Sequence, residues 1–120
     1  MTLSEIFEDY SRLPEYLGMS LVDVNQVSLF GDRPINIAAT RGSIPEMAVL
    51  IGAGASVNSP GEHGYTPLHN AVEQGAYDAV NWLIREGADL MAVNELGMTP
   101  LDLAVALDEA MLVEMLSDQR

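Results

Sequence analysis

The chain has 120 residues, of which 18 are acidic and five are arginine, and it has no lysine, so its formal net charge is −13 at pH 7. A surface this acidic repels phosphate backbones, which argues against nucleic-acid binding and favours a basic protein partner; alternatively, the acids simply keep a lysine-free protein soluble. The absence of cysteine excludes disulfides, thiolate catalysis and cysteine-based zinc sites.

The beginning of the chain lacks the features of a targeting signal. Its first ten residues, MTLSEIFEDY, are acidic and do not have the basic-then-apolar layout of a signal peptide. No apolar run approaches the roughly 18–20 residues that span a bilayer. We therefore expect a cytoplasmic protein without membrane contact. The length of 120 residues predicts a single domain over residues 1–120, and the hydrophobic content of 48% is that of a folded chain.

Residues 1–30 are expected to form an N-terminal cap and a first loop. Thr2 and Glu5 have the spacing of a capping box. Pro14 marks a second, shorter helix, from which Tyr16 and Leu17 are expected to pack on the next unit. The apolar residues of the first helix recur at helical spacing, at Leu3, Ile6, Phe7 and Tyr10.

The tip of the first loop is unusually apolar for a projecting turn. The loop covers residues 21–30, and its tip has the sequence Ser28-Leu29-Phe30. Phe30 either folds back onto the cap or is offered to a partner. We favour the fold-back.

After the cap, several residue types recur with a period of 33 residues. A fixed period between about 20 and 50 residues indicates stacked supersecondary units that bury their shared faces. We divide this part of the chain into units at 31–63, 64–96 and 97–120, the last serving as a C-terminal cap. The matching positions are Gly31, Gly64 and Gly97; Pro34, Pro67 and Pro100; Ala38, Ala71 and Ala104; and Leu50, Leu83 and Leu116.

The central unit predicts two helices and a loop. Thr66-Pro67 has the composition of a helix start, and Gly75 supplies a left-handed stop. A second helix is expected from about Tyr77 to Glu86, ended by Gly87. Residues 88–97 are too short and polar for another helix and are expected to form an extended turn.

The outward side of the last unit is apolar at Met111, Met115, Ala106 and Leu107. A terminal unit of a stack is expected to be polar on this side, because no further unit covers it. Either the last four residues fold over this end, or it is an exposed apolar patch that something covers. Methionine-rich surfaces suit adaptable binding, and self-association is the simpler explanation.

The central unit also resembles a known family. The run Gly64-Tyr65-Thr66-Pro67-Leu68-His69, followed by Ala71, Gly75, Leu83-Ile84 and Gly87-Ala88-Asp89, is similar to a full ankyrin repeat, and residues 31–58 and 97–116 resemble weaker copies. The resemblance implies an all-α solenoid of stacked helix-turn-helix units with projecting β-turn loops. It also implies a protein-binding role without shared catalytic residues, and a structural hydrogen-bonding role for His69 between loops.

In ankyrin-like stacks, loop tips and first helices line a concave side that holds the partner. Aromatic anchors among carboxylates fit a partner with basic groups around apolar pockets, and Tyr65 and Phe30 are the best anchor candidates; the alternative is an ordinary solvated groove. Mapped onto this chain, the resemblance implies partner-binding residues at Leu29, Phe30, Asp32, Arg41, Glu62, His63, Tyr65, Glu73, Gln74, Glu95, Leu96, Met98, Ala106 and Leu107.

The leading hypothesis is a non-catalytic module that binds and inhibits one basic protein, for example an immunity protein against a nuclease-type toxin. The alternative is a scaffold or accessory subunit that associates through the apolar C-terminal end. We expect no enzyme, cofactor or metal site, because no carboxylate pair stands with a nucleophile, a set of metal ligands or a phosphate-binding glycine loop. His63, for instance, has no second ligand at a useful spacing.

Overall fold

Short helices joined by loops make up the described part of the chain, which is residues 1–119 of the computed structural model. Within these residues no strand is present, which confirms the predicted all-α class. The end of the last predicted unit, residue 120, lies outside the described residues. The elements are α1 (Leu3–Tyr10), a 3₁₀ turn η1 (Pro14–Tyr16), α2 (Pro34–Thr40), α3 (Ile44–Gly52), a 3₁₀ turn η2 (Glu62–Gly64), α4 (Pro67–Glu73), α5 (Tyr77–Arg85), α6 (Pro100–Ala106) and α7 (Ala110–Ser117).

A Thr-Pro pair starts the first helix of the central hairpin and of the last hairpin. The Thr66 hydroxyl accepts a hydrogen bond from the backbone N–H of His69 (3.4 Å), and Thr99 makes the equivalent bond. The proline that follows has no N–H to leave unpaired. In the first hairpin Arg33 replaces the threonine, and the Asn36 side chain closes this end by accepting from the Arg33 N–H (2.9 Å).

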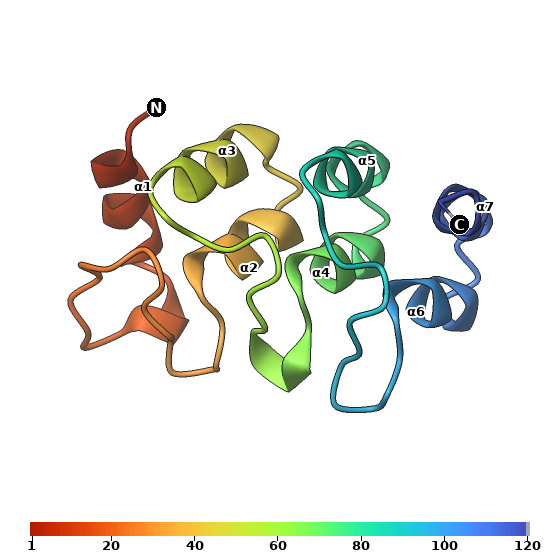
Figure 1. Ribbon diagram of the computed structural model, residues 1–120. Coiled ribbons are helices and arrows are strands. Elements are labelled where there is room, and N and C mark those ends of the chain that lie inside the picture. The colour runs from red at the N-terminus through yellow and green to blue at the C-terminus, as the bar shows by residue number, and fades with distance from the viewer. Residues whose placement is uncertain (120) are drawn as a thin grey trace.

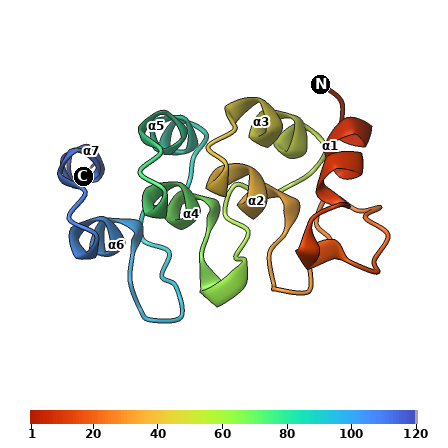
Figure 2. The same cartoon turned by 180° about the vertical axis from the view of Figure 1, so that it is seen from behind.

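The hairpins α2–α3, α4–α5 and α6–α7 stand side by side, with α2, α4 and α6 in one row and α3, α5 and α7 in the other (Figure 1). Helix α4 packs between α2 and α6, and α1 covers the first hairpin at α3. The long loops project beyond the row of first helices (Figure 2). The resulting stack measures 39 × 27 × 19 Å and has two distinct ends.

The core is an apolar seam that runs through all three hairpins. Ile35 of α2 and Leu68 of α4 occupy equivalent positions and are fully buried, as are Leu50 of α3 and Leu83 of α5. Burying such a side chain contributes about 1.5–3 kcal/mol. Helices of seven to nine residues are marginal in isolation. Contacts between neighbouring hairpins therefore hold them in place.

The capping box predicted at the start of the chain is present, whereas one expectation for the residues that follow is wrong. Glu5 and Thr2 complete the capping box, with bonds of 3.2 Å and 3.0 Å. Tyr16 is fully buried, and its hydroxyl donates to the backbone oxygen of Gln26 (2.9 Å). The expectation that Leu17 packs beside it is wrong: Leu17 is 75% exposed, because a single 3₁₀ turn directs only Tyr16 inward.

The turn inside each hairpin places one residue in the left-handed region. Gly42 (φ 66°) and Gly75 (φ 64°) fill this position in the first two hairpins, whereas Asp108 (φ 56°) fills it in the last. A side chain at positive φ is strained, so the last hairpin is less favourable at this turn than its neighbours. None of the helices within residues 1–119 has the length and apolar character needed to cross a bilayer.

Candidate protein-binding face

Neighbouring loops are joined to one another at their tips. The backbone N–H of Glu62 donates to Asp32 Oδ1 (2.9 Å), which links the second loop to the first. The backbone N–H of Glu95 donates to the carbonyl oxygen of His63 (3.0 Å), which links the third loop to the second. The loops therefore form one continuous surface instead of three independent fingers.

This surface carries carboxylates around Tyr65. Asp32, Glu62 and Glu73 line a hollow of about 200 Å³ with Tyr65, and Glu95 lines a second of about 280 Å³ with the same ring. Burial raises the pKa of Tyr65, and the Glu73 carboxylate raises it further, because both disfavour a phenolate. We call this surface the acidic loop face and define it by Asp32, Glu62, His63, Tyr65, Glu73, Glu95 and Leu96.

His63 stands at the centre of the acidic loop face and lines both hollows. Its Nε2 lies 3.5 Å from Glu62 Oε1, its Nδ1 lies 4.0 Å from Glu95 Oε2, and its side chain is 72% exposed. Its backbone is left-handed, with φ 59°. A residue other than glycine in this region is strained, and strained positions of this kind cluster at functional sites.

Asn70 also lines the hollow that contains Asp32, Glu62 and Glu73, and the sequence alone does not indicate it. The fully buried Asn36 amide donates from Nδ2 to the backbone oxygens of Ser59 (3.0 Å) and Tyr65 (3.2 Å) and to Asn70 Oδ1 (3.1 Å). Because Asn36 Oδ1 accepts from a backbone N–H, these roles fix the orientation of both amides. Asn70 Nδ2 is left without a hydrogen-bond partner among residues 1–119, at the wall of the hollow.

His69 has the structural role that the resemblance implies. Its Nδ1 accepts from the backbone N–H of Thr66 (3.1 Å), so its Nε2 carries the proton and donates to the backbone oxygen of Met98 (2.8 Å) in the next loop. Burial lowers the pKa of this imidazole. His69 is therefore a neutral connector between the second and third loops.

The first loop differs from expectation at Phe30. The fold-back of this ring onto the cap is wrong, because Phe30 is 52% exposed and Leu29 is exposed beside it. Ser28 turns inward instead: it is buried, and its hydroxyl donates to the Glu15 carboxylate (2.9 Å). Burial raises the pKa of Glu15. The hydrogen bond between Ser28 and Glu15, and not the aromatic ring, thus joins the tip of this loop to the cap.

Arg41 lies away from the acidic loop face and holds the cap. Its guanidinium pairs with Asp9 of α1 (2.8 Å) and Glu46 of α3 (3.5 Å), and it lies over the Tyr10 ring, 4.6 Å from the ring centroid. The Tyr10 hydroxyl donates to the Glu46 carboxylate. Burial and this carboxylate together raise the pKa of Tyr10 well above its usual value. This cluster links α1 to the first hairpin and is not visible in the sequence pattern.

The remaining predicted contact residues are spread along the stack. Gln74 and Leu107 follow the ends of α4 and α6, and both are exposed, as is Ala106. Met98 is half-buried and gives its carbonyl oxygen to His69. None of these four lines the two hollows of the acidic loop face.

The predicted apolar patch at the C-terminal end is corrected at Met115. This side chain is only 8% exposed, because α7 buries a stripe at Leu112, Met115 and Leu116, with the spacing of one helix face. Met111 is 67% exposed, as expected. Helix α7 continues to Ser117, so the described part of the last four residues begins inside this helix and does not fold back over it.

The acidic loop face has little local compensation for its charge. Within residues 1–119, no arginine forms an ion pair with Asp32, Glu62, Glu73 or Glu95. In the same part of the chain, no three histidine or acidic side chains are grouped so that they could hold a metal ion. The arrangement suits the recognition of a cationic group by carboxylates and an aromatic ring.

Comparison with known families gives one match that spans the centre of the stack. The family model described as ankyrin repeats (many copies) matches residues 50–104, from the end of α3 to the middle of α6. A comparison with curated proteins gave no match. Ankyrin repeats are protein-interaction modules, in keeping with the projecting loops described above. Residues 50–104 of this chain thus consist of ankyrin repeats.

Proposed function

We propose that this protein binds a basic protein through the acidic loop face and inhibits it, in the manner of an immunity protein that neutralises a nuclease-type toxin. The observation that carries this proposal is the joining of adjacent loop tips by the bonds to Asp32 Oδ1 and to the His63 carbonyl oxygen. They hold uncompensated carboxylates on one preorganised surface. Preorganisation lowers the entropy lost on binding, and the negative field speeds encounter with a cationic partner.

The hollow of about 200 Å³ suits an arginine or lysine side chain of the partner. Its carboxylates come from Asp32, Glu62 and Glu73, and the Tyr65 ring stands beside them as an aromatic wall. Asn70 Nδ2 offers a hydrogen bond to a backbone carbonyl that accompanies the cation. A nuclease gathers cationic groups to bind phosphates, so covering those groups with this face would block its substrate.

The test compares two triple variants that each remove three negative charges. Glu62→Gln/Glu73→Gln/Glu95→Gln changes the acidic loop face, and Asp78→Asn/Glu86→Gln/Asp118→Asn changes exposed acids elsewhere. Each variant and the natural protein are used to capture partners from native lysate, and the captured protein is identified and purified. Its affinity is then measured against salt, and its catalytic activity is measured with and without this chain.

The proposal predicts that the loop-face variant loses capture and inhibition, while the control variant keeps both. Equal loss in the two variants would show that total charge, and not this face, attracts the partner. Capture that leaves the partner's activity unchanged would refute inhibition and leave only the interaction module. An affinity that hardly changes with salt would contradict charge-led binding.

A second candidate is a scaffold or accessory subunit that associates through the last hairpin. The observation that favours it is the exposure of Val105, Leu107 and Met111, which are apolar residues of α6 and α7 or the turn between them. Sedimentation at increasing concentration tests this form directly. Self-association that Met111→Glu abolishes would support it, and a monomer at all concentrations would exclude it.

A further inference from the structure

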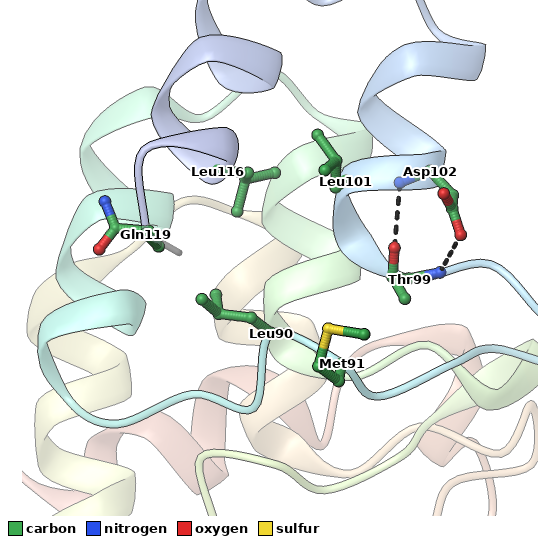
Figure 3. A pocket seen from close by; sticks show the side chains of 7 residues that line it. All are labelled: Leu90, Met91, Thr99, Leu101, Asp102, Leu116 and Gln119. Atoms are coloured by element: carbon green, nitrogen blue, oxygen red, sulfur yellow. Dashed lines mark hydrogen bonds between the residues drawn. The ribbon is translucent and has the colours of Figure 1, made fainter.

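The C-terminal end of the stack contains an open apolar groove. In the two inner repeats, Ile35 and Leu68 are fully buried because the next hairpin covers them. Leu101 occupies the equivalent position in α6 and is only half-buried. It contributes to a groove of about 380 Å³ whose floor and sides come from the third loop, the start of α6 and the end of α7 (Figure 3). The groove, which we call the end groove, is lined by Leu90, Met91, Thr99, Leu101, Asp102, Leu116 and Gln119.

The polar connectors between repeats change character at this end. Asn36 donates to the Tyr65 backbone oxygen of the next repeat (3.2 Å), and His69 donates to that of Met98 (2.8 Å). Asp102 stands one period later and is an acceptor, so it cannot make the same bond to a carbonyl. A second type of hydrogen bond between neighbouring repeats, made by side chains of the loops, is also missing at this end.

That loop connector is the asparagine pair at positions 25 and 58. Asn25 donates from its side chain to the Gly54 oxygen (3.4 Å), and Asn58 Oδ1 accepts from the Asp89 N–H (2.8 Å), each linking neighbouring loops. Met91 stands one period after Asn58 and is 75% exposed. A further hairpin built like the inner two would therefore find neither polar connector at the end groove.

A second copy of the chain is also a poor occupant. In a two-fold pairing through the end groove, the two Asp102 carboxylates would face the same small apolar contact, and like charges there repel. Each chain also carries a net charge of −13. The repulsion between the two Asp102 carboxylates and the repulsion between the two negative chains both favour an occupant that carries positive charge.

Asp102 itself shows what that occupant must supply. Its Oδ2 accepts from the Thr99 N–H (3.0 Å), which closes the start of α6, as the dashed lines in Figure 3 show. Within residues 1–119, its Oδ1 has no hydrogen-bond or ion-pair partner. The carboxylate thus stands beside the exposed Met91 and the half-buried Leu101 and Leu90 with one oxygen available to a donor.

We propose that the end groove docks an amphipathic helix of a second, different protein, which places apolar side chains against Leu90, Met91 and Leu101 and an arginine or lysine on Asp102. Apolar side chains continue the seam that ends at this hairpin, and the cation takes the free carboxylate oxygen. This binding surface is separate from the acidic loop face and does not depend on it.

The test uses fluorescent helical peptides with leucine, methionine or phenylalanine on one face and flanking arginines. A matched set carries glutamates in place of the arginines. Binding is followed by anisotropy and by NMR of ¹³C-methyl methionines, in the loop-face triple variant, so that capture by the acidic loop face is suppressed. Met91 reports on the end groove, and Met111 is an exposed methionine that does not line it.

We expect an arginine peptide to shift the Met91 methyl signal and to leave Met111 unchanged. Asp102→Asn keeps the oxygen that caps α6 and should weaken binding about two- to fivefold, the range for one exposed ion pair. Asp118→Asn removes the same charge outside the end groove and should have no effect. Met91→Gln should weaken binding about fivefold or more through lost apolar contact.

Several results would overturn the proposal. Glutamate peptides that shift Met91 equally would remove the role of Asp102, and so would equal losses from Asp102→Asn and Asp118→Asn. Met91 and Met111 shifting together would show diffuse charge attraction. Failure of every arginine peptide to shift Met91 would exclude this occupant. Broadening of the Met91 signal with protein concentration alone would identify a second copy instead.

Discussion

Replacing Asn36 by aspartate should destabilise the fold severely, although the two side chains have nearly the same size. Asn36 is fully buried, and its Nδ2 serves three acceptors at 3.0–3.2 Å: the Ser59 and Tyr65 backbone oxygens and Asn70 Oδ1. A carboxylate at this position would face those three oxygens with negative charge. In its ionised form this side chain would keep only the bond from the Arg33 N–H.

The size of the effect follows from the bonds that are lost. At most one carboxyl proton replaces the two amide protons, and each buried acceptor left unpaired costs about 1–3 kcal/mol. The Tyr65 oxygen keeps its bond from the Gly61 N–H (2.7 Å), so the loss falls on the Ser59 oxygen and Asn70 Oδ1. The introduced carboxyl avoids the larger cost of a buried charge by staying protonated, so its pKa in the folded state rises above the ordinary value. We expect a total loss of about 3–5 kcal/mol at neutral pH, a large share of the ~5–15 kcal/mol that stabilises a typical domain.

Urea unfolding followed by far-UV circular dichroism and by Trp82 fluorescence measures this loss. Because the folded state binds the extra proton, the deficit relative to the natural protein should shrink as pH falls from neutral towards about 4. The matched control is Asp102→Asn, which makes the reverse exchange at the equivalent but exposed position and should change stability by less than about 0.5 kcal/mol. A loss below about 1 kcal/mol for Asn36→Asp would refute the reasoning, because it would show that the connector contributes little.

Three further changes test other parts of the structure. Burial lowers the pKa of His69, so the stability that the neutral imidazole contributes is complete above the ordinary pKa of 6.5 and is lost as pH falls below it. The urea midpoint should therefore fall between pH 7 and about pH 5. The part of this fall that is due to His69 should disappear in His69→Gln and persist in the control His63→Gln. Asp108→Gly should stabilise the protein by about 0.5–1 kcal/mol, because glycine adopts the positive φ of 56° without strain. Gly75→Ala at the equivalent turn should destabilise the protein by about 1 kcal/mol. Calorimetric melting points that move in the opposite directions would refute this reasoning. Tyr10→Phe removes the hydroxyl that donates to Glu46 and should cost about 1–1.5 kcal/mol in urea unfolding, while Tyr77→Phe on the exposed start of α5 should cost nothing measurable.

The helix positions were predictable because their signals are local. The Thr66-Pro67 pair starts α4, and Gly75 forms the turn that follows it. The helix expected over Tyr77 to Glu86 ends one residue earlier, at Arg85, within the usual variation of helix ends. The division of the chain at 31–63, 64–96 and 97–120 stays a prediction.

The candidate site was only partly predictable. Asp32, Glu62 and Tyr65 come together because the loops that carry them recur with the repeat and are stacked in register. Arg41 stands at the repeat position of Gln74 and Leu107, but it pairs with Asp9 on α1, an interaction that depends on the packing of the cap. Contacts between residues far apart in sequence leave no period to detect.

The same reason explains the other misses. Phe30 is exposed because Ser28 finds the Glu15 carboxylate, and the two lie in different elements. The Asn70 amide is oriented by a hydrogen bond from Asn36, which lies in another repeat, so no local sequence pattern indicates its role. For the first loop, the hydrogen bond of Ser28 decides the packing, although the hydrophobicity of Phe30 alone favours burial of the ring.

Helices α6 and α7 have a neighbouring hairpin on one side only, and this determines which part of the fold unfolds locally first. Every inner hairpin is held from two sides, whereas this pair packs on α4 and α5 alone and contains the strained turn at Asp108. In a stack held by nearest-neighbour contacts, amide exchange should be fastest in the last hairpin and slow progressively towards α2. Anything seated in the end groove would slow that first opening, and would thereby lengthen the lifetime of the whole array.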